Sequence, residues 1–270
     1  MATTKTALIT GASSGFGLEF AKLFAADGYD VILVSRNGEK LADIATDLKM
    51  KHGTRAIVIQ KDLSRSGSAE ALYNEVKKHN LEIDVLVNNA GVGEHGLLTE
   101  TDMDKELAVI HLNVISLYQL TKLFLTDMVA RNEGKILQLA STASLAPLPL
   151  MSVYSGTKAF VYAFTQALVN ELKDSNVSMT ALIPGASDTD FFKKAKAEHT
   201  MIYNDTKLSD PAVVAKDGYA ALMKGKSKVI SGMKNKVQVA MSNVLPEKTV
   251  TKGARKTMEG KKEDKKEDEK

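Results

Sequence analysis

Residues 10–17 read TGASSGFG and join a short apolar run, Ala7–Thr10, to a helical pattern that begins at Leu18. The glycines follow a G-x-x-x-G-x-G spacing between the predicted strand and the predicted helix. Glycine permits a tight turn and a close approach of the backbone to a pyrophosphate, whose charge is favoured by free N–H groups at a helix N-terminus. The stretch predicts a dinucleotide site, with a purely structural turn as the alternative, formed by Gly11, Ser13, Ser14, Gly15, Phe16 and Gly17.

The same alternation of strand and helix continues along the chain, where short β-branched runs are separated by helical patterns. Near-continuous apolar strands of this kind are typical of a parallel sheet that is covered by helices on both faces. We therefore predict a doubly wound α/β fold. Its strands are predicted at Ala7–Thr10, Val31–Ser35, Ala56–Gln60, Val85–Asn88, Lys135–Ala140, Val177–Ile183 and Lys228–Ser231.

The chain shows no break in composition before about residue 245 and no internal repeat, so we expect a single domain over residues 1–245. Within it, residues 186–210 carry aromatic side chains without a strand period, and we predict a substrate lid there. Residues 246–270 mix lysines with acidic residues and contain few apolar ones. We expect a charged, disordered tail over that segment.

Composition limits the partners and the location. The 270 residues include 36 basic and 33 acidic side chains, a net charge of +3, which is too balanced to indicate nucleic-acid binding. The chain has no cysteine, so disulfides, thiolate nucleophiles and cysteine-ligated metals are excluded, and we expect no metal site. No targeting pattern opens the chain, and no uninterrupted apolar stretch approaches the length of a membrane span. We therefore expect a cytoplasmic protein without a membrane partner.

The ends of the second and third predicted strands indicate which dinucleotide binds. A carboxylate after the second strand is typical of NAD, whereas an arginine accommodates the 2′-phosphate of NADP. Residues 34–37 read VSRN, and Arg36 can form paired hydrogen bonds with a phosphate, so NADP(H) is favoured over NAD(H). A solvated surface arginine is the alternative. Asp62 and Leu63 follow the third strand, where the carboxylate could hold an adenine amino group or, equally, cap a turn.

Two further strand ends complete the predicted cofactor cleft. Residues 88–91 read NNAG, where amides could brace neighbouring strands and small residues could let a ribose approach, or where the chain could simply turn. Residues 183–189 read IPGASDT, where backbone or hydroxyl groups could hold a carboxamide. These stretches predict cofactor contacts from Asn89, Ala90, Gly91, Pro184, Gly185, Ser187 and Thr189.

Residues 154–158 read YSGTK and open a helical pattern. Tyr154 and Lys158 lie on one helix face, so the ammonium can stabilise the phenolate and lower the tyrosine pKa from about 10 towards neutrality. Tyr154 could then exchange a proton with an alcohol or carbonyl oxygen, although this spacing also occurs by chance. Ser141, after the fifth strand, could donate to the same oxygen or serve as a cap. Asn113, inside a long helix predicted over about residues 102–128, could hold a water or be satisfied in the core.

These motifs together resemble the short-chain dehydrogenase/reductase family over about residues 4–231. The resemblance rests on TGASSGFG, NNAG, Asn113, Ser141, YSGTK and IPGASDT in family order. It implies a Rossmann-like sheet of seven strands, a homodimer or homotetramer, and a catalytic tetrad. In that tetrad Lys158 also holds the nicotinamide ribose and Asn113 positions a water; its members are Asn113, Ser141, Tyr154 and Lys158. One departure is Phe16, where many members have isoleucine, and its backbone N–H should serve equally well.

The sequence therefore predicts an NADP(H)-dependent oxidoreductase that interconverts a secondary alcohol and a ketone or aldehyde by hydride transfer, with Tyr154 as acid and base. An apolar small-molecule substrate is expected from Leu145, Leu148, Leu150, Met151, Phe191 and Phe192. Two alternatives stay open: a 3-oxoacyl-type reductase of carrier-bound acyl chains, and a non-catalytic NADP-sensing protein. A further apolar stripe is expected to pack against the core or a second subunit rather than on a membrane, and comprises Val237, Ala240, Met241, Val244 and Leu245.

Overall fold

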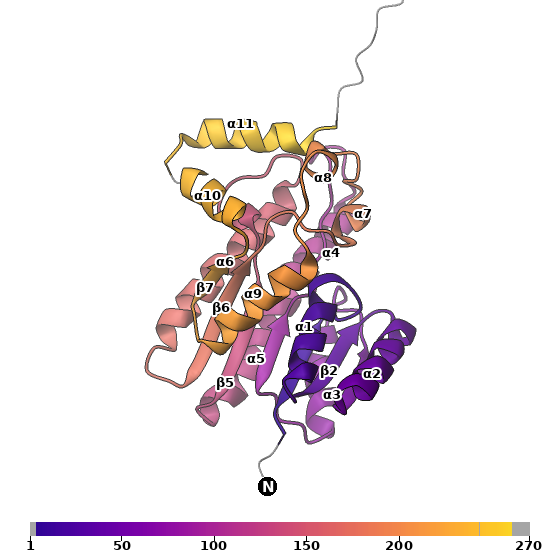
Figure 1. The fold of residues 1–270 in the computed structure, drawn as a ribbon. Helices are drawn as coiled ribbons and strands as arrows, with labels where there is room; N and C mark the ends of the chain where they lie inside the picture. The colour runs from indigo at the N-terminus through magenta and orange to yellow at the C-terminus, as the bar shows by residue number, and fades with distance from the viewer. Residues whose placement is uncertain (1–3, 243, 261–270) are drawn as a thin grey trace, which may run out of the picture.

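The computed structural model describes residues 4–242 and 244–260, which are arranged around one sheet of seven parallel strands. The strands lie in the order β3-β2-β1-β4-β5-β6-β7, and helices cover both faces of the sheet (Figure 1). The predicted doubly wound α/β fold is confirmed, with each predicted strand placed to within one residue at either end. The strands are β1 Thr6–Thr10, β2 Asp30–Ser35, β3 Ala56–Gln60, β4 Val85–Asn88, β5 Gly134–Leu139, β6 Val177–Ile183 and β7 Lys228–Ile230.

Apolar side chains on alternate sides of the strands build two cores, one on each face of the sheet. In β1, Ala7 and Ile9 belong to the first core, and Leu8 between them belongs to the second. Because both faces are buried, the strands are almost entirely apolar, which is why their positions could be predicted from sequence. The helices of the first core are α1 Gly15–Ala26, α2 Gly38–His52 and α9 Pro211–Met223, and those of the second are α3 Ser68–Lys78, α5 Leu117–Ala130 and α6 Ser152–Glu171.

The long helical segment that precedes β5 contains an irregular turn. The sequence predicts one helix over residues 102–128; the structure has α4 Met103–Ile110, a π-helical turn His111–Ser116, and then α5. Asp102 caps the start by accepting a hydrogen bond from the Asp104 N–H at 2.9 Å. By length and composition alone, residues 103–130 could cross a membrane; 39% of the apolar window in this segment is buried, and α5 packs into the second core.

The predicted lid is more ordered than its sequence indicates. Two short helices, α7 Phe191–Lys194 and α8 Met201–Asn204, interrupt the segment that was expected to be irregular. Phe192 is buried together with Ala195 and Met258 in a small apolar cluster of its own. Closure of residues 186–210 over a substrate stays a prediction.

The disordered tail predicted from residue 246 is wrong over its first part. Helix α10, Met233–Ser242, is followed by α11, Glu247–Met258, which lies across the end of the molecule farthest from the N-terminus (Figure 1). Val250, Ala254 and Met258 recur every four residues and give this lysine-rich helix an apolar side. Its end is fixed to α8, because Met258 is buried and the Met201 N–H donates to the Glu259 carbonyl at 2.9 Å. Residues 261–270 of the predicted tail lie outside the described residues.

Candidate active site

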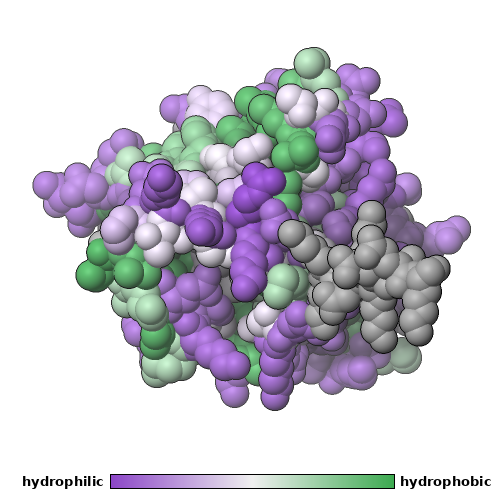
Figure 2. Space-filling view, turned by 90° about the horizontal axis from the view of Figure 1, so that it is seen from above, coloured by the Kyte–Doolittle hydropathy of each residue, from purple (hydrophilic) through white to green (hydrophobic). Residues whose placement is uncertain are grey.

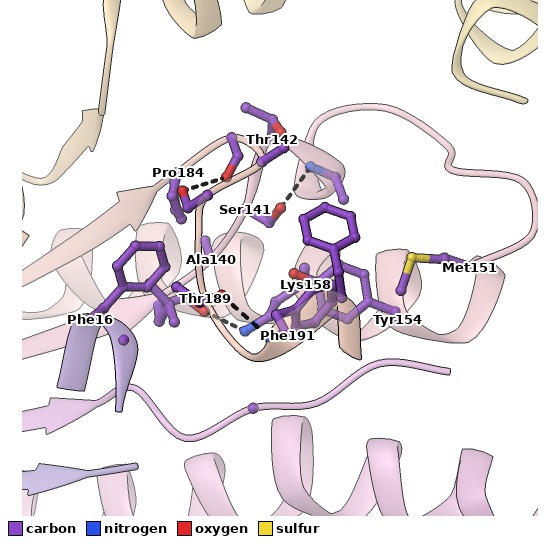
Figure 3. A pocket seen from close by; sticks show the side chains of 18 of the residues that line it. Phe16, Ala140, Ser141, Thr142, Met151, Tyr154, Lys158, Pro184, Thr189 and Phe191 are labelled. Atoms are coloured by element: carbon purple, nitrogen blue, oxygen red, sulfur yellow. Dashed lines mark hydrogen bonds between the residues drawn. The ribbon is translucent and has the colours of Figure 1, made fainter. Parts of the chain in front are cut away.

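A cavity of about 1090 Å³ lies at the carboxyl ends of the strands, between the glycine-rich turn and the C-terminal helices. Ligands of open parallel sheets bind at this edge. Every predicted cofactor residue except Gly17 lines the cavity, and so do three residues of the predicted tetrad. Figure 3 shows the centre of the cavity, where Ser141, Tyr154 and Lys158 lie close together. The fold therefore gathers residues that are far apart in the sequence into one site.

The glycine-rich turn fits the phosphates of a dinucleotide. Gly11 and Gly15 have φ angles of +67° and +53°, which favour glycine. A Cβ atom at Gly17 would lie 2.2 Å from the Gly11 carbonyl oxygen, so Gly17 packs α1 against the turn and does not face the cavity. Ser14 begins α1 without a capping bond from its side chain, and the first turn of α1 has no acid, so its N–H groups can receive an anion.

Cationic side chains gather where β2 and β3 reach the cavity. Arg36 lines the wall as predicted, and Lys40 and Lys61, which sequence reasoning missed, line it too. Asn37 caps α2 by accepting a hydrogen bond from the Lys40 N–H at 3.0 Å, which fixes Lys40 in the first turn of that helix. The signal that could have found Lys40 is its position four residues after Arg36. Lys61 also forms a salt bridge with Glu75 at 3.0 Å.

Asp62 has the turn role that was one of its two interpretations, and it also lines the cavity. Its carboxylate accepts hydrogen bonds from the Ser64 N–H at 3.1 Å and the Ser64 hydroxyl at 2.6 Å. Burial raises the pKa of Asp62, but these hydrogen bonds and the charges of Arg36 and Arg65 outweigh burial and lower that pKa below its usual range. The carboxylate is therefore ionised at neutral pH, and a contact with adenine stays a prediction.

The Asn-Asn-Ala-Gly stretch braces the floor of the cavity. Asn89 Nδ2 donates to the carbonyls of Thr10 at 2.8 Å and Gly11 at 3.3 Å, which ties the end of β4 to the end of β1 as predicted. A Cβ atom at Gly91 would lie 3.4 Å from Lys158 Nζ, so glycine keeps space beside the lysine. A sugar hydroxyl can approach the ammonium through that space.

The turn after β6 forms the opposite wall. The Thr142 N–H donates to the Pro184 carbonyl at 2.9 Å, which joins this turn to the end of β5. Thr189 Oγ1 accepts a hydrogen bond from the Phe191 N–H at 3.3 Å and so fixes the start of α7 (Figure 3). These hydrogen bonds hold the wall in place. The predicted contacts of this wall with a carboxamide stay predictions.

Ser141, Tyr154 and Lys158 meet in the middle of the cavity. Ser141 begins a short 3₁₀ turn, Thr142–Ser144, and its hydroxyl accepts a hydrogen bond from the Ala143 N–H at 3.1 Å. Ser141 therefore caps this turn and also lines the cavity. Tyr154 lies in the first turn of α6, close to Ser141 (Figure 3). Lys158 is buried and donates from Nζ to the Leu139 carbonyl at 2.7 Å, while Nζ lies 5.9 Å from the centre of the Tyr154 ring.

The predicted lowering of the Tyr154 pKa is wrong for this structure. Burial raises the pKa of Tyr154 to about 12, and the nearby Ser141 hydroxyl offsets only part of that increase. Burial also lowers the pKa of Lys158 to about 8. The ammonium is directed at a main-chain carbonyl rather than at the phenol oxygen, so burial decides both shifts. Tyr154 is accordingly a protonated donor at neutral pH.

Asn113 lies behind the lysine rather than in the cavity wall. Its Oδ1 accepts from the Val92 N–H at 3.0 Å, and its Nδ2 donates to the Val92 carbonyl at 2.9 Å and to Thr157 Oγ1 at 3.0 Å. The side chain is fully buried at the π-helical turn. Asn113 therefore joins the loop after β4 to α6, and its hydrogen bonds are satisfied in the core, which was one of its two interpretations. The water that it was expected to position stays a prediction.

The far end of the cavity is apolar. The Phe191 ring lies 4.9 Å from the Tyr154 ring, and Figure 3 shows Met151 on the same side of the site. A Cβ atom at Gly93 would lie 2.7 Å from Met151 Cε and 2.9 Å from Phe191 Cζ, so glycine gives both side chains room. The remaining wall comes from α10, α11 and the turn between them and was missed from sequence: Met233, Val237, Met241, Leu245, Val250, Ala254 and Met258. Only Val237, Met241 and Leu245 of these belong to the apolar stripe predicted from sequence.

His95 fastens α11 to the body of the molecule. Its Nε2 lies 2.8 Å from the Met258 carbonyl, and its ring lies 4.9 Å from the ring of His199 in the predicted lid. His95 is half-buried and is thus a structural contact between the loop after β4 and α11, which with α10 forms the roof of the cavity.

A dinucleotide turn beside a serine, a tyrosine and a lysine in a doubly wound sheet defines a class, the nicotinamide-dependent oxidoreductases. A family model described as short chain dehydrogenase matches residues 5–200. The chain belongs to this family.

Named relatives and a solved structure agree with that assignment. The chain is 37% identical over 194 residues to 17-beta-hydroxysteroid dehydrogenase type 3 of Mus musculus, covering 69% of this chain and 61% of the relative. It is 38% identical over 176 residues to a very-long-chain 3-oxoacyl-CoA reductase of Pyrenophora tritici-repentis, covering 63% and 51%. A short-chain dehydrogenase from Sphingobium yanoikuyae in complex with NADPH superposes with a TM-score of 0.80 at 26% identity, covering 89% of this chain and 94% of that one. The chain thus spans between half and two thirds of the two curated relatives.

Proposed function

We propose that this protein is an NADP(H)-dependent oxidoreductase that interconverts a secondary alcohol and a ketone, or reduces an aldehyde, on an apolar small molecule. The observation that carries the proposal is the convergence of Ser141, Tyr154 and Lys158 in one cavity with the glycine-rich turn. A bound nicotinamide cofactor supplies or accepts the hydride. The side chains of this protein bind the substrate oxygen and move its proton.

In the reductive direction, Tyr154 donates the proton that the substrate oxygen receives. Its pKa of about 12 keeps the phenol protonated until negative charge develops on that oxygen. The Ser141 hydroxyl donates to the same oxygen and stabilises charge where it forms. Lys158, with a pKa of about 8, is mostly protonated at neutral pH, and its ammonium stabilises the phenolate that remains. Oxidation follows the same path in reverse.

The preference for NADP(H) is supported by the three cations at the adenosine end, Arg36, Lys40 and Lys61. A charged hydrogen bond to a phosphate is worth enough to change affinity roughly tenfold to a hundredfold. Arg36→Asp should therefore lower the ratio of NADPH to NADH efficiency by that factor. Arg55→Asp, at an exposed position at the opposite end of β3, is the matched control and should leave the ratio unchanged. An unaltered ratio in Arg36→Asp would contradict the cofactor proposal.

A second candidate is the reduction of 3-oxoacyl thioesters. The apolar wall along α10, formed by Met233, Val237 and Met241, could follow an acyl chain, and one named relative is a very-long-chain 3-oxoacyl-CoA reductase. A non-catalytic sensor is disfavoured, because all four tetrad residues are present.

The experiment that tests the proposal is NADPH consumption, with NADH in parallel, across ketones, aldehydes and 3-oxoacyl thioesters of graded size. Turnover of free ketones with NADPH supports the first candidate, and turnover limited to thioesters supports the second. Tight NADPH binding without turnover of any compound would favour the sensor and contradict both.

A homodimer or homotetramer is part of the proposal. Exposed apolar side chains lie on α4, on the π-helical turn, at the start of α5 and on α6. A second copy could cover them: Met103, Leu107, Ile110, Ile115, Tyr118 and Phe160. Sedimentation equilibrium on the full chain tests this, and a monomer at micromolar concentration would contradict it.

A further inference from the structure

An apolar stripe on α10 and the turn after it runs from the inside of the cavity to the outside of the molecule. Met233, Val237, Met241 and Leu245 follow one another every four residues, line the cavity, and are 71%, 52%, 55% and 42% exposed. Val244, in the turn between α10 and α11, is 85% exposed and does not line the cavity. The stripe therefore continues past the mouth of the cavity to the tip of that turn.

Within the part of the chain that the structure describes, this stripe has no apolar cover. Helix α10 has one buried residue, Val239, which also lines the cavity, and the four residues of the stripe belong to none of the buried clusters. The pattern was expected to pack against the core or a second subunit. The exposed fractions of these side chains exclude packing of the stripe against the core.

Positive charge surrounds the stripe. The side of α11 that faces away from the cavity carries Lys248, Lys252, Arg255 and Lys256, and α10 adds two more lysines. Residues 231–260 contain six basic and two acidic residues, a net charge of +4, whereas the whole chain has +3. The rest of the chain is therefore slightly acidic, and the basic character of the protein is local to this end.

We propose that the α10–α11 end of the molecule docks on the surface of a membrane that contains anionic lipids. An apolar tip flanked by lysines is the pattern of helices that lie in the interface between headgroups and acyl chains. The tip, Met241, Val244 and Leu245, enters the acyl boundary, and the lysines of α11 contact lipid phosphates. Figure 2, which looks onto this end, shows hydrophobic patches bordered by hydrophilic surface.

The charge argues for lipid over a second copy of the chain. Two such ends facing each other would bring together two net charges of +4, and like charges at close range repel. An anionic bilayer supplies the opposite charge and an apolar interior at the same place. Docking in this way would hold the cavity mouth against the bilayer, where apolar small molecules concentrate.

The test is flotation of the full chain with vesicles of phosphatidylcholine alone or with about one third phosphatidylglycerol, a fraction that gives a negative surface potential. We expect binding to the anionic vesicles that weakens at high salt, and little binding to neutral ones. Val244→Asp should abolish binding, and Lys248→Glu with Lys252→Glu should weaken it roughly tenfold or more. Matched controls on remote surfaces, Met50→Asp and Lys224→Glu, should bind as wild type does.

NADPH binding and thermal unfolding establish that each variant is folded, so a lost interaction cannot be mistaken for lost structure. Equal binding to neutral and anionic vesicles, or binding that survives Val244→Asp, overturns the proposal. A dimer in solution that Val244→Asp dissociates also overturns it, because a second copy would then cover the stripe. Vesicle binding needs no turnover, so its outcome is separate from that of the proposed reaction.

Discussion

The glycine-rich turn and the α10–α11 roof stand at opposite ends of one cavity and are built differently. A Cβ atom at Gly17 would meet the Gly11 carbonyl at 2.2 Å, whereas a Cβ atom at Gly253 in α11 would have no described atom within 4 Å. The turn continues directly from the buried strand β1, but α11 has a single fully buried side chain, Met258. The first region tolerates no added atom, and the second is held mainly at its end.

This difference separates the chemistry from the selection of substrate. Hydride and proton transfer require atoms placed within fractions of an ångström, which packed strands and their ends provide. A wall that is open to solvent can adapt to ligands of different length, and changes there leave the reacting groups in place. Substitutions at the turn and the tetrad should therefore have large effects on reaction, and substitutions in the roof should have smaller, substrate-dependent ones.

The largest effect is expected from Tyr154→Phe, which removes the proton donor and leaves the ring. The rate of carbonyl reduction should fall about a thousandfold, the typical contribution of a positioned acid, with NADPH affinity unchanged. Stopped-flow reduction and fluorescence titration of NADPH measure the two quantities. Tyr162→Phe on the same helix, whose hydroxyl accepts from Lys228, is the control and should remain active. Near-normal turnover of Tyr154→Phe would remove this tyrosine as the acid.

The next effect concerns the buried charge of Lys158, whose pKa is lowered from 10.5 to about 8. Between these values the unfolded chain binds a proton that the folded chain does not, so the stability of the wild type rises with pH across that window. The free energy of unfolding of the wild type should increase by roughly 3 kcal/mol across this window, and that of Lys158→Met should lack this increase. Urea unfolding without cofactor at pH 7.5 and near pH 10.5 measures the difference between the two proteins.

Lys173→Met, at an exposed position, controls for the loss of one lysine. As the pH rises, the free energy of unfolding of the wild type should increase relative to that of Lys158→Met. Its difference from the free energy of unfolding of Lys173→Met should stay constant. A constant difference from both variants would mean that burial leaves Lys158 unperturbed.

Gly17→Ala and Gly253→Ala make the comparison directly. The added methyl at Gly17 must displace backbone, so the free energy of unfolding should fall by about 1–3 kcal/mol and NADPH affinity should fall with it. At Gly253 the methyl enters open space in a helix, where alanine is favoured over glycine, and the melting temperature should be unchanged or slightly higher. Thermal melts with and without NADPH measure both, and equal destabilisation would remove the distinction between the regions.

The predictable parts of the site are those whose cause is local in sequence. Gly11, Gly15 and Gly17 are needed by one turn, and Tyr154 and Lys158 share one helix face. Ser141 could be placed with them because the carboxyl ends of parallel strands meet at one edge. The chain order of these residues therefore predicts their proximity before any coordinate is known.

The unpredicted parts depend on burial and on packing between distant segments. The direction of the Tyr154 pKa is decided by desolvation, which sequence spacing does not reveal. Lys40 resembles many solvated lysines until β2 and α2 place it beside Arg36. Helix α11 has the composition of a disordered tail, and it is ordered because Met258 docks near α8 and His95 binds the Met258 carbonyl.

The smallest effect is expected in the roof and depends on the substrate. Val250→Asp places a carboxylate on the side of α11 that lines the cavity, and should raise the KM for a large apolar ketone about tenfold, because a charge must be desolvated beside it. A small ketone that reaches only Tyr154 and Phe191 should keep its KM, and NADPH affinity should not change. Thr251→Asp, one residue on and outside the cavity lining, is the matched control. Equal effects of the two substitutions on large and small ketones would show that α11 does not contact substrate, and selection would then lie with Met151 and Phe191 beside the tyrosine.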